Sequence, residues 1–106
     1  MKPDCKQRKR VANYTYPNGD EIGIYLEENT KNKWAFGIDQ WWGKDGKDGG
    51  WVNKSDFKYK SEREAATEAF NVIIVSLIAM RNGPVAVAFK HMMTAYLSPQ
   101  LSLPFF

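Results

Sequence analysis

The feature that most constrains the fold is a long apolar helix signal with a clear start and a clear end. Ser61 and Glu64 have the spacing of a capping box, in which each side chain accepts a hydrogen bond from the backbone N–H of the other residue. The Asn-Gly-Pro sequence at 82–84 ends the helix, because glycine suits the left-handed C-terminal position and proline cannot continue the hydrogen-bond ladder. A stripe of apolar residues at helical spacing lies between these limits: Ala66, Ala69, Phe70, Ile73, Leu77 and Met80.

Further apolar residues, Val72, Ile74, Val75 and Ile78, extend this surface around the helix, so more than one neighbour must cover it. A sheet and a second helix would cover two sides. Another copy of the protein is an alternative cover, which makes a homodimer compatible with the sequence.

A second, shorter helix is predicted to begin at Pro84, because proline fits the first turn of a helix. Ser98 and Pro99 stop it. Its apolar stripe consists of Val85, Ala88, Phe89, Met92 and Tyr96.

The chain before residue 60 predicts strands joined by turns. Residues 11–16 suit a strand, the Pro-Asn-Gly-Asp sequence at 17–20 is a turn, and alternating aliphatics follow at 22, 24 and 26. Residues 34–42 form the next alternating segment, and a glycine-rich loop at 43–50 leads to a fourth candidate strand at 51–54. The predicted fold is therefore α+β, with a three- to four-stranded antiparallel meander followed by a long helix and a second shorter helix.

The 106 residues suit one compact domain, predicted over 11–98, between a flexible basic arm at 1–10 and an extended tail at 99–106. The formal net charge is +3, and five basic residues lie among the first ten against the single acidic Asp4. The arm is therefore a candidate for sequence-blind phosphate contacts, or alternatively a solubilising terminus. Its candidate nucleic-acid contacts are Lys6, Arg8, Lys9 and Arg10.

The C-terminal tail has the pattern of a recognition peptide. Pro99 and Pro104 bias the residue before each of them toward extended backbone. An extended peptide presents alternate side chains to a pocketed surface, while a glutamine amide hydrogen-bonds at the rim. The candidate partner-binding residues are Gln100, Leu101, Leu103 and Phe105.

Residues 100–105 resemble the peptide with which many bacterial replication and repair proteins dock on the DNA polymerase sliding clamp. The resemblance implies that Gln100 fills one subsite of the clamp and that the leucines and Phe105 fill its hydrophobic pocket. The alternative is that this apolar tail packs on its own domain as a final edge strand or cap.

Residues 22–70 resemble the sheet-plus-helix DNA-binding domains of plant ethylene-response factors and of some phage integrase arms. The likeness lies in the element order and in the Lys-Trp-Ala, Gly-Trp-Val and Glu-Ala-Ala sequences at 33–35, 50–52 and 64–66. That family reads the major groove through Arg and Trp on its sheet, whereas this region has no arginine before Arg63. The resemblance therefore implies nonspecific or single-stranded DNA binding, with Lys33, Trp41 and Lys54 as candidate contacts.

The sequence shows no catalytic constellation. His91 is the only histidine and has no second ligand or nucleophile at a recognisable spacing, and Cys5 is the only cysteine. We therefore predict no enzymatic activity, no metal site and no cofactor. A single cysteine, the absence of a secretory signal and an apolar run too short to span a bilayer predict a cytoplasmic protein without membrane contact.

The preferred hypothesis is a small replication- or DNA-associated binding protein, tethered to the sliding clamp by its C-terminal peptide. One alternative is a sheet-surface DNA-binding module. Another is a bacterial phage or mobile-element protein that inhibits a host enzyme by protein–protein contact.

Overall fold

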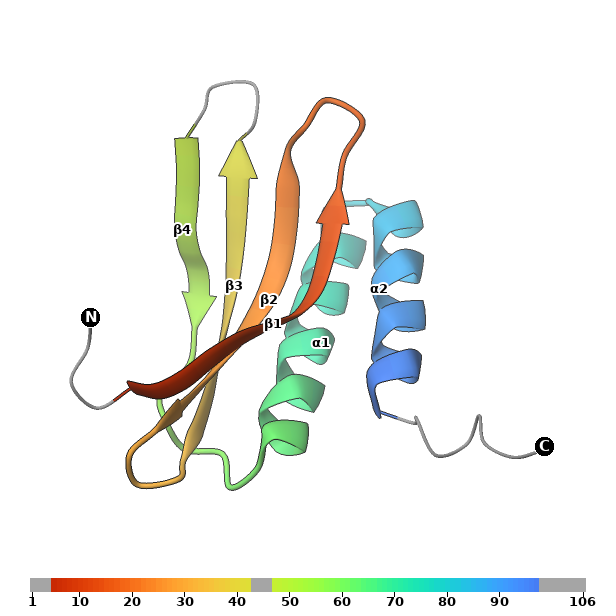
Figure 1. The fold of residues 1–106 in the computed structure, drawn as a ribbon. Helices are drawn as coiled ribbons and strands as arrows, with labels where there is room; N and C mark the ends of the chain where they lie inside the picture. Colours follow the sequence, from red (N-terminus) through yellow and green to blue (C-terminus); the bar gives the residue numbers. More distant parts are fainter. Residues whose placement is uncertain (1–4, 43–46, 98–106) are drawn as a thin grey trace.

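The computed structural model describes residues 5–42 and 47–97, with side chains described for 6–40 and 55–97. The strands pair in an antiparallel sheet of order β1-β2-β3-β4, and two helices follow (Figure 1), which confirms the predicted α+β fold class. The elements are β1 Cys5–Thr15, β2 Glu21–Asn29, β3 Trp34–Trp42, β4 Lys47–Lys54, α1 Glu62–Ala79 and α2 Gly83–Leu97.

Two turns set the register of the first three strands. In the β1–β2 turn, Gly19 has a φ of 96°, and its N–H donates to the carbonyl of Tyr16 at 2.9 Å. In the β2–β3 turn, the Asn29 side-chain oxygen accepts hydrogen bonds from the N–H groups of Lys31 and Lys33, at 3.0 and 2.9 Å. The resulting pairing aligns the aliphatic residues of β2 with the apolar residues of β3 on one face of the sheet.

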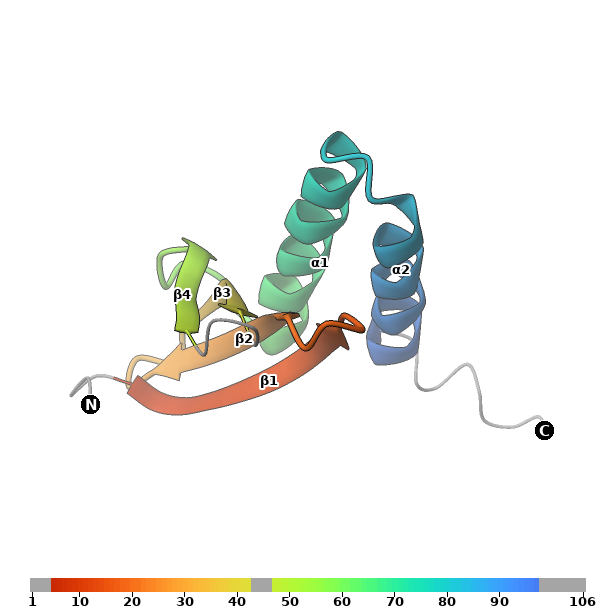
Figure 2. The same ribbon diagram turned by 90° about the horizontal axis from the view of Figure 1, so that it is seen from above.

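The helices form a second layer on that face of the sheet (Figure 2). α1 lies over β2 and β3, and α2 lies beside α1 and against β1. The apolar stripe of α1 meets the sheet, as its spacing predicts, and α2 covers a second side of it. The largest fully buried side chains are Phe70, Phe89, Ile24, Leu26, Ile73 and Leu77.

The two ends of α1 lie where the sequence places them, with one difference in hydrogen bonding. The Ser61 hydroxyl accepts the N–H of Glu64 at 3.1 Å, as a capping box requires. The Glu64 carboxylate, however, accepts the N–H of Lys60 at 3.1 Å, rather than that of Ser61. At the other end, Arg81 has a φ of 59°, and the Asn82 N–H bonds to the Leu77 carbonyl at 2.8 Å.

The structure differs from the predicted boundaries at two strands. Residues 5–10, assigned to a flexible arm, instead form the first half of β1 and pair with residues 25–29 of β2. Strand propensity did not indicate this pairing, because it depends on contacts between cationic side chains and carboxylates far along the chain. β4 begins at Lys47, inside the segment predicted as a glycine-rich loop, and pairs with β3 in an interrupted register.

Replacing Leu26 by alanine should lower the free energy of unfolding by about 3 kcal/mol, because the side chain is fully buried and leaves a cavity. Urea denaturation measures this loss. Met80→Ala is the control, since this side chain is 62% exposed, and it should change the unfolding free energy by less than about 0.5 kcal/mol. Equal losses in the two variants would contradict this placement of the core.

Candidate nucleic-acid interface

The cationic side chains of β1 all meet carboxylates. These acidic partners come from β2 and from the first turn of α1, so the pairs join segments that are distant in sequence. The nitrogen–oxygen distances are 3.7 Å for Lys6–Glu28, 3.7 Å for Arg8–Glu27, 2.9 Å for Lys9–Glu62 and 3.5 Å for Arg10–Glu21.

Two of these pairs are asymmetric, with the carboxylate inside and the cation outside. The Arg8 side chain is 47% exposed, whereas that of Glu27 is 7% exposed. Lys6 and Glu28 show the same order. A buried carboxylate beneath a cation reduces the net charge and also orients the cationic group. An anionic partner that approaches β1 therefore meets cations first.

Tyr25 holds two of these cations together. The guanidinium carbons of Arg8 and Arg10 lie 4.7 and 4.6 Å from the centroid of the Tyr25 ring, within the range of cation–π attraction. The Arg10 Nε donates to the Tyr25 hydroxyl at 3.0 Å, and its Nη1 donates to the Asn13 side-chain oxygen at 2.5 Å. The hydrogen bond to Tyr25 raises the pKa of Arg10 above its ordinary value, so this guanidinium stays charged.

This cluster lies on the face of the sheet that the helices leave uncovered. Strand alternation places Tyr25 on the side opposite Ile24 and Leu26, which face α1. The residue opposite Tyr25 on β3 is Gly37, and Gly23 lies two residues before Tyr25 on β2. Neither glycine has a side chain to project from the sheet beside the ring. A larger residue at Gly23 would be crowded, since a Cβ would lie 3.0 Å from the Ala12 carbonyl oxygen and from the Asn13 side-chain oxygen.

The predicted contacts divide into three groups in space. Arg8 and Arg10 share the open face, whereas Lys9 reaches Glu62 on α1. The Lys6 ammonium donates to the Asn32 side-chain oxygen at 3.1 Å, which brings it to the β2–β3 turn beside the exposed Lys33. We name Lys6, Arg8 and Arg10 the β1 strip.

The other predicted site residues are less fully described. Trp41 lies in β3 and Lys54 in β4, but their side chains are outside the described part of the structure. Gln100, Leu101, Leu103 and Phe105 lie outside the described residues.

Sequence reasoning missed two features of this site. It placed no arginine on the sheet, yet β1 begins early enough to bring Arg8 and Arg10 there. It also missed Tyr25, Glu27 and Glu28. The period-2 spacing of Arg8 and Arg10 is a signal that these two side chains share one face of a strand. It identifies their partners on β2 only when the register between β1 and β2 is known.

A second charged contact links the sheet to both helices. The Glu62 carboxylate accepts hydrogen bonds from the Lys9 ammonium at 2.9 Å and from the Tyr96 hydroxyl. Burial alone would raise the pKa of Glu62, but these two hydrogen bonds and the Lys9 charge outweigh it and lower the pKa below its ordinary value. Burial and the bond to Glu62 raise the pKa of Tyr96. This contact therefore ties β1, α1 and α2 together.

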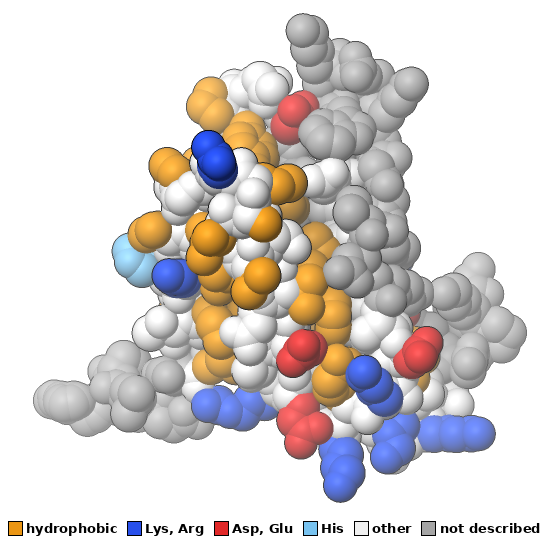
Figure 3. All heavy atoms as spheres, turned by 180° about the vertical axis from the view of Figure 1, so that it is seen from behind, with side chains coloured by type: hydrophobic (Ala, Val, Ile, Leu, Met, Phe, Trp, Pro, Cys, Tyr) orange, Lys and Arg blue, Asp and Glu red, His pale blue; other side chains and the backbone are white. Residues whose placement is uncertain are grey.

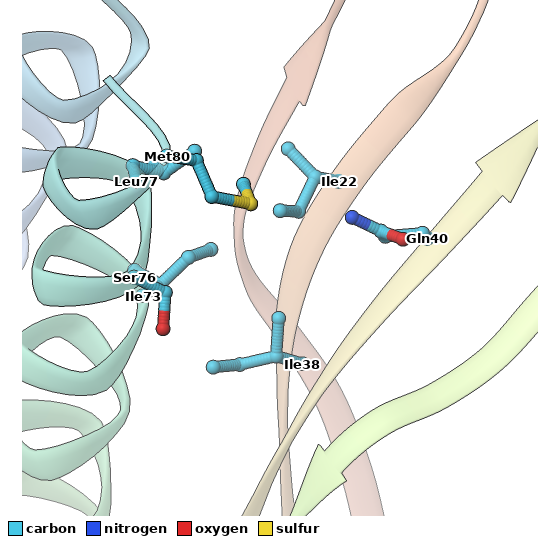
Figure 4. A pocket seen from close by; sticks show the side chains of 7 residues that line it. All are labelled: Ile22, Ile38, Gln40, Ile73, Ser76, Leu77 and Met80. Atoms are coloured by element: carbon cyan, nitrogen blue, oxygen red, sulfur yellow. The ribbon is translucent and has the colours of Figure 1, made fainter. Parts of the chain in front are cut away.

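An apolar pocket of about 260 Å³ lies between the C-terminal half of α1 and the sheet (Figure 4). Its polar groups are the Gln40 amide and the Ser76 hydroxyl, and the Met80 side chain extends over it from the end of α1. The described lining residues include no nucleophile activated by a base and no acidic group. They suit apolar contact rather than acid–base chemistry.

Within the described residues, no cluster of three or more His, Cys, Asp or Glu side chains is arranged to hold a metal ion. No helix in the described part of the chain is both long enough and apolar enough to cross a membrane. His91 lies exposed on α2.

Comparison with protein families, with characterised proteins and with solved structures finds no match to this chain. The resemblances of residues 100–105 and 22–70 therefore stay predictions.

Replacing Glu62 by glutamine should lower the unfolding free energy by about 1 kcal/mol at neutral pH, because the charge-assisted bond from Lys9 is lost. The pKa of Glu62 is lowered in the folded protein, so the stabilisation is present above the ordinary carboxyl pKa and disappears as the pH falls through the lowered value. Urea unfolding of both proteins at about pH 7 and about pH 3 measures the difference.

The stability difference between wild type and Glu62→Gln should therefore shrink in acid. Tyr96→Phe, which removes the other donor, should lower the stability at neutral pH independently. A difference that stays the same in acid would contradict the charge-based role of Glu62.

Proposed function

We propose that this protein is a non-enzymatic, DNA-associated binding protein that contacts the sugar-phosphate backbone through the β1 strip. The observation that carries the proposal is the arrangement of Arg8 and Arg10 around Tyr25 on the open sheet face, with the Glu27 carboxylate buried beneath. This arrangement presents oriented guanidinium groups outward, and guanidinium groups form strong bonds with phosphate oxygens.

The ion pairs set the expected strength of the contact. Each carboxylate paired with the strip cancels part of the positive potential that a phosphate would meet, so the affinity should be modest and strongly dependent on salt. Three cations that each replace a counterion predict a slope of log K against log salt of about −2 to −3.

The same geometry favours backbone contact over base readout. Arg10 already donates to Tyr25, Asn13 and Glu21, so its guanidinium has few directions left for paired hydrogen bonds to a base edge. Arg8 lies against the ring of Tyr25 and beside Glu27. Phosphate contact needs only one outward N–H group, and the proposal is accordingly sequence-independent DNA binding.

A second proposed contact is the docking of residues 100–105 on a sliding clamp. A specific observation favours it: the Arg63 Nη1 donates to the Leu97 carbonyl at 2.5 Å and fixes the end of α2 at the start of α1. The neighbouring residue Glu62 binds Lys9 of β1. Leu97, the last described residue before the predicted peptide, is therefore held at the end of the molecule that also carries the basic half of β1. A clamp-bound protein would meet the encircled DNA at that end.

Arg8→Ala should weaken DNA binding about three- to tenfold at low salt and reduce the magnitude of the salt slope by about 1. Fluorescence anisotropy of a labelled duplex, titrated with the intact protein at several salt concentrations, measures both quantities. Lys90→Ala is the matched control, because Lys90 is an exposed cation on α2, away from the strip. If the two variants lose equal affinity, or if the intact protein does not bind, the assignment of the strip is wrong.

The tail contact is tested separately. Isothermal calorimetry of the intact protein with purified bacterial sliding clamp should show micromolar binding, and simultaneous Gln100→Ala, Leu103→Ala and Phe105→Ala changes should abolish it. The far-UV circular dichroism spectrum should stay unchanged, since α2 ends at Leu97. Absence of binding by the intact protein would overturn clamp docking and leave the β1 strip unaffected.

A further inference from the structure

The outer surface of the helix layer carries large apolar side chains that its own chain leaves exposed. Val75 is 65% exposed, Ile78 53% and Val87 49%. Figure 3, which views the molecule from behind, shows hydrophobic side chains gathered on this side. We name Val75, Ile78 and Val87 the outer helix patch.

These three residues form one surface. Val75 and Ile78 are three residues apart on α1 and so share a face of that helix. α2 returns antiparallel to α1 after a short connection (Figure 1), and Val87 lies as far beyond that connection as Val75 lies before it. The patch therefore crosses from α1 to α2 near their connected ends.

The residue types at these positions need an explanation. Outward positions earlier in α1 carry Glu64 and Glu68, which are good helix formers that suit water. In the later half of α1 the outward positions carry Val75 and Ile78 instead. β-Branched residues are weaker helix formers, and an exposed apolar side chain does not gain the stabilisation that burial would give. Burial against another surface would offset both costs.

We propose that the outer helix patch is the interface of a homodimer, in which α1 of one copy lies antiparallel to α1 of the other across a twofold axis near Val75. Charge complementarity favours a second copy of the protein as the partner of this patch. Glu68 lies seven residues before Val75, and Arg81 lies six residues after it, just beyond the end of α1. An antiparallel second copy places its Arg81 near Glu68 and its Glu68 near Arg81, so the same charge pair forms twice.

The surface is chemically unlike the β1 strip. It combines an apolar centre with one acidic end and one basic end, which suits an identical copy better than a polyanion. A patch of three large side chains is small beside the roughly 800 Å² per partner of a standard interface. The dimer should accordingly be weak, with a dissociation constant on the order of 10 µM.

Sedimentation equilibrium of the intact protein, from about 1 to about 200 µM, tests the proposal. The wild type should fit a monomer–dimer equilibrium, and Ile78→Glu should stay monomeric throughout. Met80→Glu is the matched control, because Met80 is as exposed as the patch residues but faces the pocket beside the sheet. Circular dichroism should confirm that both variants keep the fold.

Charge exchange tests the antiparallel arrangement. Glu68→Arg alone and Arg81→Glu alone should each weaken the dimer about tenfold, because each brings like charges together at two places. The double variant should recover the wild-type dissociation constant. A wild type that is monomeric at all concentrations, or dimerisation that survives Ile78→Glu, would overturn the dimer and leave the patch to a different protein. Failure of the double variant to recover would overturn the antiparallel arrangement.

Discussion

The pairing of β1 with the carboxylates of β2 is the interaction on which the rest of the structure depends. β1 carries cations at 6, 8, 9 and 10, and a strand of this charge would repel itself if acidic partners did not lie beside it. With Glu27 and Glu28 beneath them, the cations instead hold β1 along the edge of the sheet. β1 then supplies a surface for α2 and, through Lys9, a contact for α1.

This constraint also explains why the two faces of the sheet differ. Aliphatic residues of β2 and β3 bind α1, so that face is closed by the core. The intervening positions carry mostly Tyr25, glycines and charged residues, with Ala35 and Trp41 as the other apolar residues, which are too few to form a second apolar layer. The open face is therefore available for polar contacts, and its chemistry is set by the cations of β1.

The sequence predicts most of the fold because its signals are local. The capping residue Ser61, the left-handed end of α1 and the alternation of β2 and β3 each depend on neighbours a few residues away. The start of β1 and the role of Tyr25 were not predictable in this way. Both depend on which residue of β1 lies opposite which residue of β2, and the bulge between Arg10 and Ala12 shifts that register. The candidate site was thus half predicted, with its cations identified and their partners missed.

The two proposed surfaces lie on opposite layers, and this arrangement limits how they can act together. A twofold axis through the outer helix patch directs the β1 strips of the two copies away from each other. One straight DNA segment could not contact both strips, so dimerisation would add no avidity for a short duplex. Two segments, or two parts of one bent segment, could each contact one copy. The dimer would therefore be able to bridge two DNA segments. The salt dependence of each contact would remain that of a single β1 strip.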